Sequence, residues 1–158
     1  MGATRLVSPL ELPIDHFRLL GVGPDRDAQA VLQMLDQRLE RKPGPGYSQE
    51  TLEARAELLN ASADLLSDAQ RRGAYEAQLT ALAGEGEERV PALDLPPSKE
   101  VAGLLLLLEA GQPMETFQLA RRALQPPQAP VLGSSREADL TRLAAEASLA
   151  AAAEFRHE

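Results

Sequence analysis

Leucine and alanine recur every three or four positions along most of this chain, which is the spacing of one face of an α-helix. Glycine, proline and capping residues interrupt the pattern three times within residues 14–82, at Gly21, at the sequence PGPG (43–46) and near Ser67. Each proline lacks a backbone donor and restricts the residue before it, so residues 43–46 end a helix firmly. The pattern therefore predicts four helices in residues 14–82.

Polar residues at the ends of these segments support the same division. Asp25 or Asp27 is expected to cap the second helix, which runs to about Arg41. Ser48 is expected to cap the third helix, and Ser67 with the glutamine three residues later fits a capping box for the fourth. The positions expected to face inward are Phe17, Leu19 and Leu20, then Ala28, Val31, Leu32, Leu35 and Leu39, then Leu52, Ala56, Leu59, Ala63 and Leu66, then Tyr75, Leu79 and Leu82.

The C-terminal part of the chain repeats the helical pattern after an acidic, proline-containing linker at residues 83–97. Two helices follow within residues 98–158, and because only Gly111-Gln112 separates them, they should form an antiparallel hairpin. The five leucines at 104–108 are apolar all round, which predicts a helix buried on most sides. A last helix from Ser134, where Ser134 and a glutamate three residues later again fit a capping box, has an apolar stripe with no following partner in the sequence. We therefore expect a truncated helical-repeat region. That stripe is Leu140, Leu143, Ala147 and Ala151.

Composition agrees with an all-α fold, because 28 leucines and 26 alanines stand against only seven valines and isoleucines. We expect an N-terminal tail at residues 1–13, a four-helix unit at 14–82, and a helical hairpin with one further helix at 98–158. The absence of cysteine suits a cytoplasmic compartment. No apolar run is long enough to predict a signal peptide or a membrane span.

The charge and the polar residues limit the possible functions. A formal net charge of −8 does not fit nucleic-acid binding, which requires a basic surface. The two histidines, His16 and His157, lie in different segments, and no pattern of metal ligands or of a nucleophile with its base is present. We therefore predict no catalytic residue, no metal and no cofactor, and the function left is binding.

Two sets of residues are candidates for contact with a protein partner. The first is a basic strip at the end of the second helix, Arg38, Arg41 and Lys42, and the second comprises Phe117, Arg121 and Arg122 on the hairpin. A local positive surface on an acidic protein could receive an acidic peptide. The alternative is that these cations are solvated and only complement the negative end of a helix.

The first half of the chain resembles a J-domain. The resemblance rests on Leu20-Gly21-Val22 at the end of the first helix, on Leu66-Ser67-Asp68 before the last, and on Arg72-Gly73-Ala74-Tyr75 within it. A working J-domain carries His-Pro-Asp in the hinge after its second helix, where this chain has Pro43-Gly44-Pro45. The departure removes the motif that a DnaK-type chaperone reads.

Over nearly its whole length the chain is similar to the N-terminal region of the ZipN division proteins of cyanobacteria. The segments that carry this similarity are LPIDHFRLLGV, RAELLNASADLLSDAQRRGAYEAQL, PPSKEVAGLLLLLEAG and ALQPPQAPVLGSSREADLTRLAA. The resemblance implies a cytoplasmic J-like domain without His-Pro-Asp, followed by helical repeats, in a longer protein with a transmembrane helix elsewhere. It also implies a non-enzymatic adaptor that binds FtsZ, with other division proteins recruited alongside, and that anchors and organises the division ring.

Other functions stay open at this point. A degenerate J-domain cofactor of a DnaK-type chaperone is the main alternative, and an ATPase assay with the chaperone would test it. The segment could also serve mainly as a spacer within a longer chain. An all-helical enzyme is disfavoured because no nucleophile, base and oxyanion groups converge.

Overall fold

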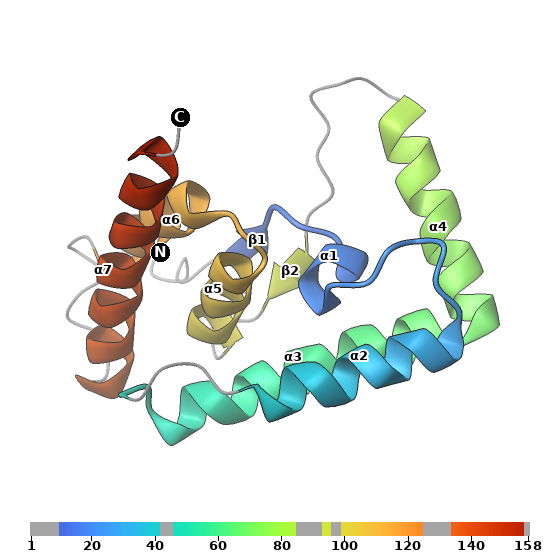
Figure 1. Ribbon diagram of the computed structural model, residues 1–158, viewed down its shortest axis with the longest axis horizontal. Coiled ribbons are helices and arrows are strands. Elements are labelled where there is room, and N and C mark those ends of the chain that lie inside the picture. Colours follow the sequence, from blue (N-terminus) through green and yellow to red (C-terminus); the bar gives the residue numbers. More distant parts are fainter. Residues whose placement is uncertain (1–9, 42–45, 85–92, 96–98, 125–133, 157–158) are drawn as a thin grey trace, which may run out of the picture. The chain divides into compact units, whose positions relative to one another are not determined.

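The computed structural model describes residues 10–41, 46–84, 93–95, 99–124 and 134–156 (Figure 1). Within them the elements are β1 (Leu10–Leu12), α1 (His16–Leu20), α2 (Ala28–Glu40), α3 (Gln49–Ser67), α4 (Ala69–Gly84), β2 (Leu93–Leu95), α5 (Glu100–Glu109), α6 (Pro113–Leu124) and α7 (Ser134–Arg156). The expected all-α class is confirmed, because the described residues fold into helices apart from loops and two strands of three residues each.

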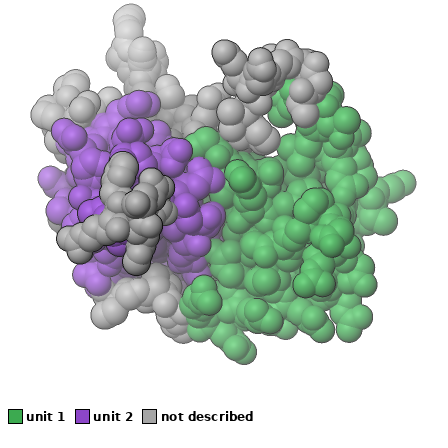
Figure 2. All heavy atoms as spheres, turned by 45° about the horizontal axis from the view of Figure 1, so that its top comes forward, with its two compact units in different colours: residues 1–42, 56–97 green, residues 43–55, 98–158 purple. Residues whose placement is uncertain are grey.

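The chain divides into two compact units, coloured separately in Figure 2. Unit 1 comprises Met1–Lys42 and Ala56–Pro97, and unit 2 comprises Pro43–Arg55 and Ser98–Glu158. The boundary falls inside α3, so the first two turns of this helix group with the C-terminal helices. Helical periodicity did not predict that grouping, because α3 is continuous in sequence and in structure.

Unit 1 is built around the short helix α1, whose two ends are both capped. The Asp15 carboxylate accepts a hydrogen bond from the backbone N–H of Arg18 at 2.7 Å. Gly21 ends the helix with φ 95°, a left-handed conformation that favours glycine, and its N–H donates to the carbonyl of Phe17. Phe17, Leu19 and Leu20 are buried, as the sequence predicted.

Helices α2 and α4 bury less apolar surface than their patterns predicted. Asp27 caps α2, as expected, by accepting from the N–H of Ala30. Val31 is fully buried, whereas Leu32 is 48% exposed. Of the other inward positions predicted for these helices, Ala28 is exposed and Leu35, Leu39, Tyr75, Leu79 and Leu82 are half-buried.

The start of α4 differs from the capping box that the sequence predicted. The Asp68 carboxylate accepts from the N–H groups of Gln70 and Arg71, at 3.0 and 3.3 Å, so Asp68 is the cap. The Ser67 hydroxyl instead donates to the carbonyl of Asp64 within α3. Prediction of Ser67 as the cap was therefore wrong by one residue, because an aspartate directly after it competes for the same N–H groups.

His16 lies in a polar contact between α1, α3 and α4 in unit 1. Its Nδ1 is 2.7 Å from the buried Ser62 hydroxyl, and its backbone N–H donates to the Tyr75 hydroxyl at 2.9 Å. The two rings meet edge to face with their centroids 5.0 Å apart. Burial lowers the pKa of His16 below its ordinary value of 6.5, opposed by Asp15 and reinforced by Arg71.

This histidine should make unit 1 less stable in mild acid. Because the pKa of His16 is lower in the folded chain, the unfolded chain binds the proton more readily. The free energy of unfolding is therefore at its full value above pH 6.5 and decreases as the pH falls below it. A single group can change the free energy of unfolding by at most about 1.4 kcal/mol per pH unit. Urea denaturation at several pH values should show that the free energy of unfolding decreases less with falling pH in His16→Asn than in the wild type. Equal declines would contradict the prediction.

Two short strands close unit 1 across a long sequence separation. β1 and β2 pair antiparallel, with Leu10 opposite Leu95 and Leu12 opposite Leu93. Leu12 and Leu95 are buried. Residues 93–95, which the sequence assigned to a linker, therefore belong to a sheet, and a pattern of three residues is too short to predict this.

Unit 2 packs α6 and α7 around α5 (Figure 1). Every residue from Val101 to Leu107 is buried and Leu108 is half-buried, which confirms the prediction of a helix buried on most sides. Gly111, with φ 90°, lies in the short turn before α6, and α5 and α6 pack as the predicted hairpin. The apolar stripe of α7 is also buried, against α5 and α6. Its partner thus lies within the chain, and the stripe no longer argues for a missing neighbour.

Candidate partner-binding surfaces

Arg38 does not lie on the surface, which corrects its assignment to a basic strip. Only 8% of the residue is exposed, and its Nη1 donates to the carbonyl oxygens of Leu19 and Leu20, at 2.9 and 2.7 Å. These carbonyls belong to the last turn of α1, where no further turn of helix can satisfy them. Arg38 therefore holds α2 against the end of α1 inside unit 1.

The rest of the predicted basic strip is reduced to one described residue. Arg41 is exposed and forms the C-terminal cap of α2. Lys42 lies outside the described residues, as does Pro43-Gly44-Pro45, the position of the J-domain hinge motif. A strip of three cations at the end of α2 is thus not the arrangement in this structure.

The second predicted set remains together on α6. Phe117 is half-buried, and the guanidinium of Arg121 lies 5.6 Å from the centre of its ring, a cation–π contact. Arg121 and Arg122 are exposed in the last turn of the helix. Sequence reasoning missed Met114, which is 38% exposed one turn before Phe117 on the same face. Its spacing of three residues from Phe117 was the available signal.

Sequence reasoning also missed a polar cluster that ties the start of α3 to α7 in unit 2. Asp139 is 2% exposed, and its carboxylate accepts from the Ser48 N–H and hydroxyl and from the Thr51 hydroxyl, the two hydroxyl contacts being 2.6 and 2.7 Å. The Ser48 hydroxyl also accepts from the N–H of Thr51, which confirms Ser48 as a cap. A buried carboxylate from α7 thus reinforces the positive end of α3.

A second group of contacts lies beside Asp139. The Tyr47 hydroxyl donates to Glu146 at 2.7 Å, and the Arg142 guanidinium lies 5.3 Å from the centre of the Tyr47 ring. Burial and the Glu146 carboxylate raise the pKa of Tyr47, so its hydroxyl stays protonated and keeps donating. Gly46 has φ 112°, a left-handed conformation that favours glycine, and the Arg142 guanidinium lies close to it.

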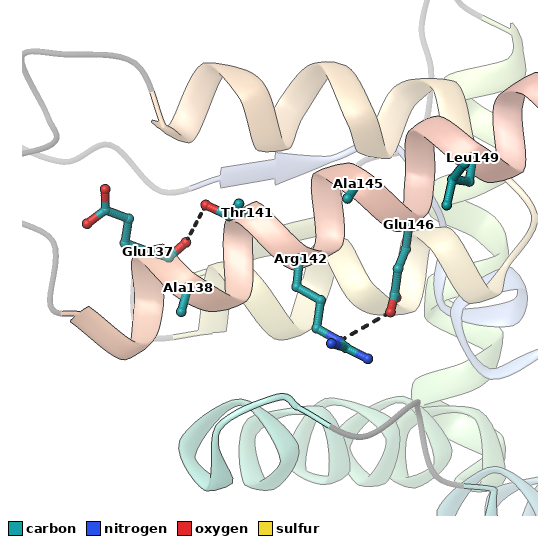
Figure 3. A pocket seen from close by; sticks show the side chains of 7 residues that line it. All are labelled: Glu137, Ala138, Thr141, Arg142, Ala145, Glu146 and Leu149. Atoms are coloured by element: carbon teal, nitrogen blue, oxygen red, sulfur yellow. Dashed lines mark hydrogen bonds and ion pairs between the residues drawn. The ribbon is translucent and has the colours of Figure 1, made fainter.

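An open groove of about 690 Å³ runs along the face of α7 shown in Figure 3. It is lined by Glu137, Ala138, Thr141, Arg142, Ala145, Glu146 and Leu149. Its polar side chains already interact, since Arg142 pairs with Glu146 at 3.2 Å and Thr141 donates to the Glu137 carbonyl. Leu149, 73% exposed, is its largest apolar side chain. The groove therefore combines small and apolar side chains with polar groups that pair with one another.

In the described ranges, no three or more His, Cys, Asp or Glu side chains are grouped so that they could hold a metal ion. No helix there is both long enough and apolar enough to cross a membrane.

Comparison with known proteins finds similarity to proteins of plastid division. Residues 94–158 match the family model described as the plastid division regulator ARM repeat, a range that contains α5, α6 and α7. Over 101 residues the chain is 27% identical to the chloroplast protein Accumulation and Replication of Chloroplasts 6 of Arabidopsis thaliana. The alignment covers 64% of this chain and 12% of that relative. No solved structure matches the chain. These similarities support a division-related family and a helical-repeat unit in the second half of the chain.

Proposed function

We propose that this chain is a non-enzymatic adaptor of cell division, which binds FtsZ and helps to anchor and organise the division ring as part of a longer membrane protein. The observation that carries the proposal is the match of residues 94–158 to a division-regulator repeat, in the same residues that fold into the three packed helices of unit 2. Helical repeats act through extended surfaces that receive other proteins.

The side chains of the described residues support binding rather than reaction. Three buried charged residues form hydrogen bonds that hold secondary structure elements together: Arg38, Arg55 and Asp139. None of them is left facing a cavity where it could act on a substrate. Exposed apolar and charged residues, by contrast, lie together on α6 and along the groove of α7. A cytoplasmic placement and an origin in the cyanobacterial ZipN branch belong to the same proposal.

The adaptor role is tested by titrating the fluorescently labelled chain with full-length FtsZ and with FtsZ lacking its C-terminal tail, at two salt concentrations. We expect binding that needs the tail and weakens as salt rises, because screening reduces attraction between exposed charges. Binding that ignores the tail would place the contact on the body of the filament. Absence of binding to both forms would contradict an FtsZ adaptor and would favour a spacer.

A further inference from the structure

One side of α6 carries four exposed residues and the half-buried Phe117. We call this set the α6 face: Met114, Phe117, Gln118, Arg121 and Arg122. The residues are spaced three, four, seven and eight positions from the first, so they share one side of the helix. Pro113, Thr116 and Ala120 are buried on the opposite side, within unit 2. The helix is thus anchored by one side and free to contact a partner with the other.

The charges on the α6 face differ from those elsewhere in unit 2. Three other arginines of this unit pair with carboxylates inside it: Arg55 with Glu109, Arg136 with Glu100 and Arg142 with Glu146. Among the described residues, no carboxylate forms an ion pair with Arg121 or Arg122. The two guanidinium groups therefore form a local positive site in the last turn of α6, on a chain whose net charge is −8, while the exposed Glu115 lies in the first turn of the same helix.

Apolar groups lie directly beside this positive site. The Arg121 guanidinium lies over the Phe117 ring, 5.6 Å from its centre, and this contact restricts its rotamers. Met114, one turn before Phe117, adds a flexible thioether that adapts to different side-chain shapes. A partner that complements both features carries carboxylates next to an apolar side chain.

We propose that the α6 face binds an acidic peptide segment of a protein partner, with an apolar side chain on Met114 and Phe117 and carboxylates on Arg121 and Arg122. Guanidinium groups bind carboxylates through paired hydrogen bonds, which gives the contact direction as well as attraction. A nucleic acid or an anionic membrane is a poorer fit, because two cations on an acidic protein do not offset the repulsion of a polyanion. The inference rests on the proposed adaptor function and names its surface.

The first test uses a synthetic fluorescein-labelled peptide in which glutamates flank two leucines, with a matched peptide in which glutamine replaces glutamate. We expect the whole chain to bind the acidic peptide, and Arg121→Glu/Arg122→Glu to weaken that binding by about tenfold or more. Arg121→Gln/Arg122→Gln should weaken it less. Met114→Asp should weaken it without removing a cation. Circular dichroism of each variant confirms that the helices are retained.

The matched control is Arg41→Glu, which reverses an exposed cation at the end of α2 in unit 1 and should leave the affinity unchanged. Equal binding of the two peptides, an unchanged affinity in the double arginine variant, or an equal loss in Arg41→Glu would overturn the proposal. Binding to anionic vesicles or to an oligonucleotide in preference to the acidic peptide would overturn it as well.

Competition with FtsZ separates this inference from the proposed function. If FtsZ displaces the peptide and the double arginine variant loses both, the α6 face is the adaptor surface. Peptide binding that FtsZ does not affect would retain the α6 face for another acidic partner while removing its assignment to FtsZ. FtsZ binding that survives in the double arginine variant would keep the adaptor function and reject the α6 face.

Discussion

Replacing Leu104 with aspartate is expected to destabilise unit 2 severely and to lower its melting temperature. Leu104 is fully buried in the middle of α5, and the residues on either side of it are buried as well. An aspartate there would place a carboxylate without a partner in an apolar interior, which costs more than about 4 kcal/mol. Since a domain is stable by only about 5–15 kcal/mol in total, this loss is a large share of the stability of the unit.

Thermal denaturation followed by circular dichroism would measure the effect, and hydrogen exchange would assign it to α5, α6 and α7. Leu149→Asp is the matched control, because it makes the same chemical change at a residue of unit 2 that is 73% exposed. We expect the control to change the stability by less than about 1 kcal/mol. A melting temperature that is equal in Leu104→Asp and wild type would show that α5 is not buried as described.

A second large effect is expected from Asp139→Ala in α7. The substitution removes an acceptor that binds the Ser48 N–H and two hydroxyl groups, and it leaves the buried Thr51 hydroxyl without that acceptor. Hydrogen bonds to charged groups contribute about 1.5–3 kcal/mol each. Contributions that share one acceptor are not additive, so we expect a total loss in the free energy of unfolding of about 2–4 kcal/mol. The loss should be concentrated where the first turns of α3 meet α7.

Hydrogen exchange of the amides at the start of α3 would detect this loss more directly than a global melting curve. Asp139→Asn keeps the shape and one acceptor oxygen, so it should lose less than the alanine variant. Glu137→Ala, an exposed acid on the same helix, should change exchange in α3 little. If Asp139→Ala and Glu137→Ala had the same small effect, the carboxylate would not be holding the two helices together.

Helix type and approximate length followed from the sequence because they depend on local interactions. The spacing of leucines and alanines, the glycine at the end of α1 and the turn at Gly111 each act within a few residues. The leucine run was correctly predicted as buried on most sides, because no rotation of a helix that is apolar all round keeps its leucines out of water unless other elements cover most of it. The candidate pair Phe117 and Arg121 was also found, since residues four apart on a helix are neighbours.

Burial and pairing over long sequence separations could not be predicted in the same way. An arginine at a helix end looks exposed in a sequence, yet Arg38 is buried because the free carbonyls of α1 lie within its reach. Leu32 matched an apolar stripe, but packing leaves about half of it exposed. The strand β2 forms only because β1 lies opposite it, with the 80 residues of 13–92 between them.

Local patterns in the sequence were enough to predict the all-helical class, the positions of the helix breaks and the buried character of α5, because these depend on backbone propensity and on periodicity along one helix. The grouping of the start of α3 with the C-terminal helices, and the role of Asp139 in holding it there, became visible only in the folded chain. The same holds for the burial of Arg38 and for the exposure of the α6 face. These outcomes depend on contacts between residues that are far apart in the sequence, and a local sequence pattern does not determine the free energy of such contacts.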